Sequence, residues 1–155
     1  TGAQDLCARI GLAVTPWDLA ETVHGGPYPQ ILEHDIFLNC ILAQEGTPRL
    51  VPIDAATQIR DLRVIGDIAC DPDSAYNPVP LYENVTSWAE PAFRAAYEPP
   101  LDIIAIDSLP SLLPLESATD FSTQLLPVLK TLDLPNEGAW ARAYEVFEQS
   151  IGTLV

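Results

Sequence analysis

Basic side chains are scarce in this sequence. Lys and Arg account for 7 of the 155 residues, Asp and Glu for 22, and the formal net charge is −15. Proteins that bind nucleic acid neutralise its phosphates with clustered Lys and Arg, and anionic membrane surfaces attract the same kind of cluster. We therefore expect no nucleic-acid partner and no membrane-surface partner. Acidity of this degree indicates solubility more than a particular function.

Long hydrophobic runs are lacking as well. No stretch of 18 apolar residues is present to span a membrane, and the first residues do not have the basic and then apolar pattern of a secretory signal. The sequence contains three cysteines, Cys7, Cys40 and Cys70, which are far apart in the chain. The ligands of a metal site are usually closely spaced. We expect a cytoplasmic protein without a metal site, in which Cys40 and Cys70 are buried free thiols within strands.

Apolar segments that alternate with helical patterns are what the sequence does contain. Hydrophobic residues make up 48% and charged residues 19%, as in a folded domain. Four strands are predicted, at residues 12–14, 35–42, 62–69 and 101–106. Helices are predicted at residues 1–10, 29–33, 52–61, 116–132 (kinked at Pro127) and 137–151. This order predicts an α/β fold with a doubly wound parallel sheet.

Prolines interrupt the stretch between residues 71 and 100, which we expect to be a long loop with a short extended piece at 79–82. The strand that follows ends on Asp107 and Ser108, where a Pro-rich turn begins. In open α/β sheets, ligands bind beyond the carboxyl ends of the strands. Asp107 is therefore a candidate ligand contact.

Six motifs, in order along nearly the whole chain, resemble the carboxyl-terminal half of the NAD-dependent, lysine-forming saccharopine dehydrogenases. They are WDLAETVHGGP (17–27), DIFLNCI (35–41), RVIGDIACD (63–71), NPVPLY (77–82), LDIIAIDSLPSLLP (101–114) and LLPVL (125–129). The resemblance implies a Rossmann-like, NAD-binding fold. In that family a G-R-x-G-[ST]-G-A loop precedes the first helix, and Thr1-Gly2-Ala3 matches only its end. We thus expect a fold that lacks its first strand and most of the glycine-rich loop, with Gly2 beside the cofactor.

Asp18 lies about 16 residues after Gly2, at the end of the predicted strand 12–14. An acidic residue there binds the ribose hydroxyls and disfavours a 2′-phosphate, so NAD is expected rather than NADP. Alternatively, Asp18 caps the next helical turn. The resemblance around Trp17 and Asp18 favours the ribose role.

Asn39, Cys40 and Ile41 end the next predicted strand, at the edge that lines the adenine and ribose cleft in Rossmann folds. A hydrogen-bonded core asparagine is the alternative for Asn39. Asp67, at the end of the following strand, is a candidate for positioning the nicotinamide side or a basic group of the substrate.

The resemblance also implies that Asp107, Ser108 and Leu109 contact the nicotinamide ribose, with ordinary turn chemistry as the alternative. Ser108 departs from the His or Asn that is usual in the family, and Leu115 departs from its Arg. The family's catalytic lysine and histidine belong to the amino-terminal domain, and neither histidine of this chain matches them. We therefore assign no catalytic residue here.

The leading hypothesis is the NAD-binding portion of a saccharopine dehydrogenase, an enzyme that cleaves saccharopine to lysine and 2-oxoglutarate as a hydride passes to NAD. Its expected partners are NAD, a small amino-acid substrate and the missing amino-terminal domain, and the fragment alone is expected to be inactive. Residues 1–135 would form the partial NAD-binding domain, and residues 136–155 a helix that packs toward the missing domain. Two alternatives remain: a non-catalytic interaction module, and an oxidoreductase similar to alanine dehydrogenase.

Overall fold

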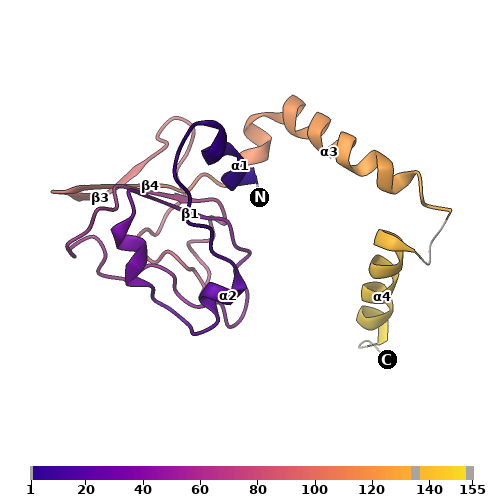
Figure 1. Cartoon of the computed structure of the whole chain (residues 1–155), viewed down its shortest axis with the longest axis horizontal. Helices are drawn as coiled ribbons and strands as arrows, with labels where there is room; N and C mark the ends of the chain where they lie inside the picture. Colours follow the sequence, from indigo (N-terminus) through magenta and orange to yellow (C-terminus); the bar gives the residue numbers. More distant parts are fainter. Residues whose placement is uncertain (1, 134–136, 153–155) are drawn as a thin grey trace. The chain divides into compact units, whose positions relative to one another are not determined.

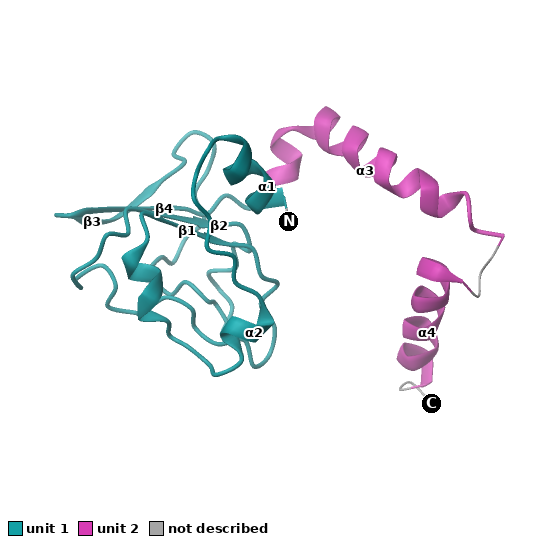
Figure 2. Cartoon of the chain, in the orientation of Figure 1, with its two compact units in different colours: residues 1–107 teal, residues 108–155 magenta. Residues whose placement is uncertain are grey.

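The computed structural model describes residues 2–133 and 137–152. The chain divides into two compact units, residues 1–107 and 108–155 (Figure 2). The first contains the helices α1 (Gly2–Arg9), α2 (Leu19–Thr22) and η1 (Pro29–Glu33), the last of which is a 3₁₀ helix, and the strands β1 (Ile36–Asn39), β2 (Val64–Asp67), β3 (Phe93–Tyr97) and β4 (Pro100–Ile104). The second contains the 3₁₀ helix η2 (Leu109–Leu112) and the helices α3 (Pro114–Leu129) and α4 (Gly138–Gly152) (Figure 1). None of the described helices is long and apolar enough to cross a membrane.

The four strands form one sheet in the order β1-β2-β4-β3. Strands β1, β2 and β4 are parallel, with Ile36 opposite Val64 and Val64 opposite Asp102. Strand β3 is antiparallel to β4. The predicted α/β class and its largely parallel, Rossmann-like sheet are confirmed, and the carboxyl ends of β1, β2 and β4 meet at one edge.

The core of the first unit lies against one face of the sheet, because side chains alternate between the two faces of a strand. In Figure 1, α2 and several of the connecting loops of this unit lie below the sheet. The buried apolar side chains are Tyr28, Ile31, Leu32, Leu50, Val51, Ala55, Leu62, Ile65, Val79, Tyr82, Leu101, Ile103 and Ala105. Each large aliphatic side chain among them contributes about 1.5–3 kcal/mol by leaving water.

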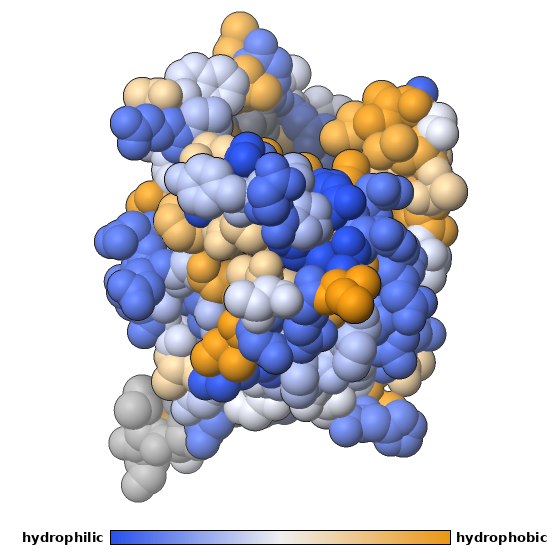
Figure 3. Space-filling model, turned by 90° about the vertical axis from the view of Figure 1, so that its left-hand side faces the viewer, coloured by the Kyte–Doolittle hydropathy of each residue, from blue (hydrophilic) through white to orange (hydrophobic). Residues whose placement is uncertain are grey.

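The opposite face of the sheet is apolar and partly exposed. Ile36, Leu38 and Ile104 are 45%, 38% and 37% exposed. Leu38 lies over Gly66, where a Cβ atom would be 2.8 Å from Leu38 Cδ2. The glycine therefore lets a neighbouring leucine cover the middle of β2. On the face of the protein shown in Figure 3, hydrophilic residues predominate and apolar ones form smaller groups among them.

The predicted strand at residues 12–14 does not form. Leu12 N donates to Cys7 O and Gly11 N donates to Ala8 O, at 2.9 and 3.2 Å, while Gly11 adopts a φ of 77°. These are the two hydrogen bonds by which a helix ends on a left-handed glycine. The segment thus terminates α1 instead of pairing with the sheet.

The predicted helix at residues 52–61 is replaced by successive turns. Arg60, buried among main-chain carbonyls, donates to Ala55 O at 3.2 Å, to Leu62 O at 3.1 Å and to Pro99 O at 2.7 Å. Burial lowers the pKa of this guanidinium, and Arg63 lowers it further. The arginine thus bonds one carbonyl of the segment, Ala55 O, together with carbonyls outside it, and the apolar spacing did not predict the turns.

Strand β3 falls within the stretch that we expected to be a loop. Pro91, Pro99 and Pro100 flank it, and an edge strand tolerates proline at its ends. The expected extended piece at 79–82 is a tight turn instead, in which Leu81 N donates to Val79 O at 2.8 Å.

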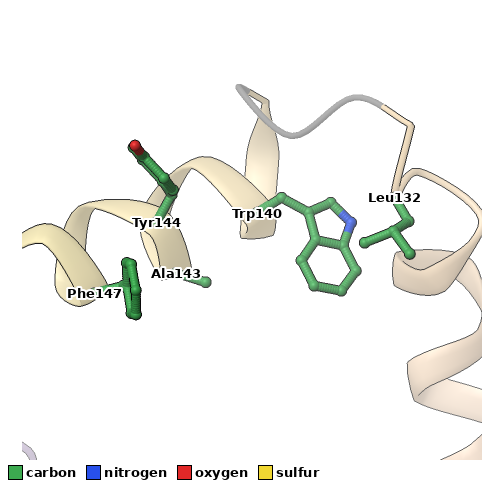
Figure 4. Close-up of a pocket in the computed structure, with 5 residues that line it drawn as sticks. All are labelled: Leu132, Trp140, Ala143, Tyr144 and Phe147. Atoms are coloured by element: carbon green, nitrogen blue, oxygen red, sulfur yellow. The ribbon is translucent and has the colours of Figure 1, made fainter.

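Helices α3 and α4 agree with the predicted helices 116–132 and 137–151 to within three residues, and Pro127 lies in the last turn of α3. Trp140 Nε1 donates to Val128 O at 3.0 Å, so α4 satisfies a carbonyl at the end of α3. In Figure 4 the Trp140 indole points toward Leu132, beside a cavity that Ala143 and Phe147 also line. Two aromatic side chains of α4 are about half exposed, at 59% for Tyr144 and 55% for Phe147.

Candidate functional site at the carboxyl edge of the sheet

Asn39 and Asp67 meet at the carboxyl ends of β1 and β2. They are register partners, each is 1% exposed, and Asn39 Nδ2 donates to Asp67 Oδ1 at 2.8 Å. The sequence predicted both residues at this edge, and the structure brings them into direct contact. Asn39 is therefore the hydrogen-bonded core asparagine that was the alternative to a direct cofactor contact.

Asp67 accepts two further hydrogen bonds. Tyr82 donates its phenol O–H to Oδ2 at 2.7 Å, and Cys70 donates its main-chain N–H to Oδ1 at 3.1 Å. A hydrogen bond to a charged group contributes about 1.5–3 kcal/mol, so three of them can offset much of the cost of burying this carboxylate. The geometry makes Asp67 the centre of a polar cluster that fixes the end of β2.

Cys70 joins the end of β2 to the end of β4. Its Sγ–H donates to Ala105 O at 3.1 Å, and its φ of 46° lies in the left-handed region. Burial raises the pKa of this thiol, and Asp67, Asp107 and Asp71 raise it further. The thiol is thus protonated and a donor at neutral pH, and three carboxylates lie within electrostatic reach of it.

Tyr82, like Cys70, belongs to this cluster although the sequence did not predict it as a site residue. It ends the NPVPLY motif, in which Asn77 Oδ1 accepts from Val79 N at 2.8 Å and Pro78 O accepts from Leu50 N at 2.9 Å. These bonds fix the loop that delivers the phenol to Asp67. Burial and the Asp67 hydrogen bond raise the pKa of Tyr82 well above its usual range. The motif itself was the signal that could have identified it.

Asp18 has the capping geometry that was the alternative to ribose binding. Its Oδ1 accepts from Leu19 N at 2.8 Å, and Glu21 Oε2 accepts from Asp18 N at 2.7 Å, which completes a capping box at α2. Asp18 is exposed and follows irregular chain rather than a strand. Gly2, the other residue assigned to this side of the cofactor, is the exposed first residue of α1, and Thr1 lies outside the described residues.

The rest of the WDLAETVHGGP motif builds a fixed loop. The rings of Trp17 and Tyr28 meet edge to face at 5.4 Å, and Tyr28 O–H donates to Thr22 O at 2.6 Å. A Cβ atom at Gly26 would lie 1.8 Å from Arg49 O. Only glycine allows this approach of two chain segments, which explains much of the motif by packing alone.

Cys40 and Ile41 follow β1, which ends earlier than predicted. Cys40 is exposed and Ile41 is 39% exposed, because the chain leaves the sheet after Asn39. Partial desolvation raises the pKa of Cys40, and Asp67 and Cys7 raise it further. Cys70, only part-buried, likewise follows its strand, so neither thiol lies within the sheet as expected.

Asp107, Ser108 and Leu109 form the turn beyond β4. Ser108 has φ 53° and ψ 42°, and its carbonyl accepts from Ser111 N at 2.8 Å and from Ser111 Oγ at 2.7 Å. Leu109 begins η2. Asp107 is exposed and is close enough to Cys70 to raise its pKa. The predicted turn chemistry is present, with one carboxylate exposed at the edge of the sheet.

The chemistry of this edge is that of hydrogen-bond acceptors. Asp67, Asp71 and Asp107 gather around Cys70, and the main-chain ends of β1, β2 and β4 border them. Such a surface suits hydroxyl groups or an amine better than it suits a phosphate. Among residues 2–133 and 137–152, no group of three or more His, Cys, Asp and Glu is arranged to hold a metal ion.

Comparison with known proteins gives a consistent result. No family model matches the chain. A protein of Schizosaccharomyces pombe, named saccharopine dehydrogenase [NAD(+), L-lysine-forming], is 38% identical over 99% of this chain. Proteins with the same name from Neurospora crassa and Candida albicans are 41% and 36% identical over 99% of it. The chain spans 42–44% of the length of these relatives.

Proposed function

We propose that this chain, which resembles the saccharopine dehydrogenases over nearly its whole length, is the NAD-binding portion of such an enzyme. The intact enzyme would cleave saccharopine oxidatively to lysine and 2-oxoglutarate. The observation that carries the proposal is the shared carboxyl edge of β1, β2 and β4, where Asn39, Asp67 and Asp107 stand, in a chain 36–41% identical to the three dehydrogenases. NAD, when bound, would supply the hydride acceptor.

The residues of this edge fit the ribose portions of a dinucleotide. Asp107 is exposed and can accept a hydrogen bond from a ribose hydroxyl. Asp67 is buried and held by Asn39, Cys70 and Tyr82, so we propose that it positions the main chain around the cofactor rather than touching it. The exposed main chain and side chains of Cys40 and Ile41 would border the adenine side.

Asp18 can combine its cap with a contact to ribose. Each carboxylate oxygen has two lone pairs, and the main-chain N–H groups of Leu19 and Glu21 occupy two of the four. A further donor, such as a ribose hydroxyl, can therefore bind the same exposed side chain. Its charge would repel a 2′-phosphate, which supports NAD over NADP.

Proton transfer and substrate recognition would belong to another part of the enzyme. The relatives are more than twice as long as this chain, and no residue here is assigned a catalytic role. We propose residues 1–135 as a partial NAD-binding domain and residues 136–155 as a segment that packs on the rest of the enzyme; the boundary falls among residues outside the described ranges. The half-exposed Tyr144 and Phe147 supply an apolar surface for that packing.

Cofactor affinity tests this proposal. The chain is titrated with NAD and with NADP by isothermal calorimetry, as wild type and as Asp18→Ala, Asp107→Ala and Glu33→Gln. We expect NAD to bind more tightly than NADP, and the two Asp variants to weaken NAD about tenfold, the effect of losing one hydrogen bond to a charged group. Glu33 is exposed on η1 and serves as the matched control. Equal affinity for both dinucleotides, or unchanged NAD affinity in both Asp variants, would favour the non-catalytic interaction module.

A further inference from the structure

A small polar cavity is lined in part by the NPVPLY loop, and it shares Tyr82 with the polar cluster around Asp67. Its volume is about 230 Å³, and its lining residues are Arg49, Pro72, Ser74, Ala75, Asn77, Pro80 and Tyr82. This space fits a molecule of a few heavy atoms, well below the size of a dinucleotide. The proposed NAD site does not use the cavity.

Hydrogen-bond donors dominate the polar part of the lining. Ser74 Oγ accepts from Tyr76 N at 3.0 Å, which leaves its O–H free to donate into the cavity. Asn77 Oδ1 accepts from Val79 N at 2.8 Å, and this bond fixes which end of the amide is the NH2 group. The described residues contain no buried side-chain polar atom that lacks a partner, so the Asn77 NH2 group, which has no protein acceptor among them, is not fully buried, and Asn77 lines the cavity.

Arg49 is the positively charged residue among those that line the cavity. Its carbonyl oxygen lies against Gly26, and Arg49 is an exposed residue among those that line the cavity. The ion pair found among the described residues joins Arg94 to Asp102, so the Arg49 guanidinium has no carboxylate partner there. In a chain of net charge −15, an exposed guanidinium without a carboxylate partner at the border of a polar cavity can attract an anion.

The acidic residues nearby do not line this cavity. Asp71 and Asp73 flank Pro72 but are not among the lining residues. Asp67 does not line the cavity either, and it accepts the hydrogen bond of the Tyr82 phenol. Pro72, Ala75 and Pro80 supply an apolar wall. The lining thus offers a guanidinium, an amide NH2 group and a hydroxyl for an anionic head, and a surface that suits a short carbon chain.

We propose that this cavity binds the carboxylate of a small organic acid. Arg49 pairs with the carboxylate, Ser74 and Asn77 donate hydrogen bonds to it, and the proline wall contacts its methylene groups. Carboxylate and guanidinium match as planar, two-pronged groups. None of the residues proposed to contact NAD lines the cavity, and the proposal needs no part of the proposed reaction.

The test is a titration of the ¹⁵N-labelled chain with sodium succinate at constant ionic strength, followed by amide chemical shifts. We expect a saturable change confined to residues 72–82 and to Arg49, with a millimolar dissociation constant. Arg49→Gln should weaken binding at least about tenfold, as loss of a charge-assisted pair does. Asn77→Asp keeps the oxygen that accepts from Val79 N but replaces the NH2 donor with an anion, and should abolish binding.

Arg142→Gln on α4 is the matched control and should leave the affinity unchanged. The proposal is overturned if no saturable shift occurs, or if Arg142→Gln weakens binding as much as Arg49→Gln does. Inorganic phosphate that binds as tightly as succinate would overturn the carboxylate assignment. The spectrum of each variant reports whether that variant is folded. If Asn77→Asp does not fold, Ser74→Ala, which removes a hydroxyl, serves as the second probe. Failure to bind NAD would leave all of these outcomes unaffected.

Discussion

The Asn39 amide donates a 2.8 Å hydrogen bond to the Asp67 carboxylate across two parallel strands, with both side chains 1% exposed. This bond ties the ends of β1 and β2 together at the edge where open α/β sheets bind ligands. Tyr82 and Cys70 complete the shell of donors around the carboxylate. The cluster holds the candidate site in shape, and most of our predictions follow from it.

Removing the phenol O–H of Tyr82 should destabilise the first unit. Tyr82→Phe leaves Asp67 Oδ2 without this donor, and the cost should be about 1–3 kcal/mol in the free energy of unfolding. Urea unfolding followed by circular dichroism measures it. Tyr76→Phe is the matched control, since Tyr76 is 39% exposed, and its effect should stay within about 0.5 kcal/mol. Equal effects of the two substitutions would show that the Tyr82–Asp67 bond contributes nothing to stability.

Gly26→Ala should be among the most destabilising single substitutions in the chain. The new Cβ would lie 1.8 Å from Arg49 O, a main-chain atom that cannot move without the loop. We expect a loss of at least about 3 kcal/mol, in the range of severe overpacking. Gly2→Ala, where no atom lies within 4 Å of the new Cβ, is the control in the same unfolding assay. A stable, fully folded Gly26→Ala protein would contradict the packing seen here.

Stability should fall in alkaline solution because of Cys70 and Tyr82. Both groups have a pKa raised by burial, Cys70 from 9.0 and Tyr82 from 10.0, so the folded state keeps their protons after the unfolded state has lost them. Their contribution to the free energy of unfolding is complete at a pH below the pKa values of the unfolded state. It is lost as the pH rises from about 9 toward the pKa values of the folded state. Each group can add a slope of up to about 1.4 kcal/mol per pH unit in that window.

Unfolding free energies between pH 7 and 11 check this dependence. Cys70→Ala should flatten the decline that begins near pH 9, and Tyr82→Phe should flatten the decline that begins near pH 10. Parallel curves for wild type and both variants would refute the assigned origin of the decline.

The elements that the sequence predicted well are those whose pattern is local. Helices α3 and α4 have helical spacing, and β1, β2 and β4 lie in short, mostly apolar stretches, so the local pattern identifies them. Asn39, Asp67 and Asp107 were placed correctly at one edge because parallel strands share their direction. Residues at the ends of such strands can be predicted without knowing their contacts.

The elements that were missed depend on long-range partners. Arg60 reaches Pro99, 39 residues away, and thereby replaces a helix with turns. Strand β3 exists because β4 pairs with it, although prolines surround it. Tyr82 joins Asp67 through a loop whose course depends on Leu50. Local propensity contains no information about these contacts, so the sequence alone did not predict them.

The most direct test of the central claim is to map NAD on the ¹⁵N-labelled chain by amide chemical shifts. The account predicts saturable changes at residues 39–41, 67–70 and 105–109, the ends of β1, β2 and β4, with α4 unaffected. Changes confined to other surfaces, or no saturable change at millimolar NAD, would contradict the assignment of the carboxyl edge as the cofactor site.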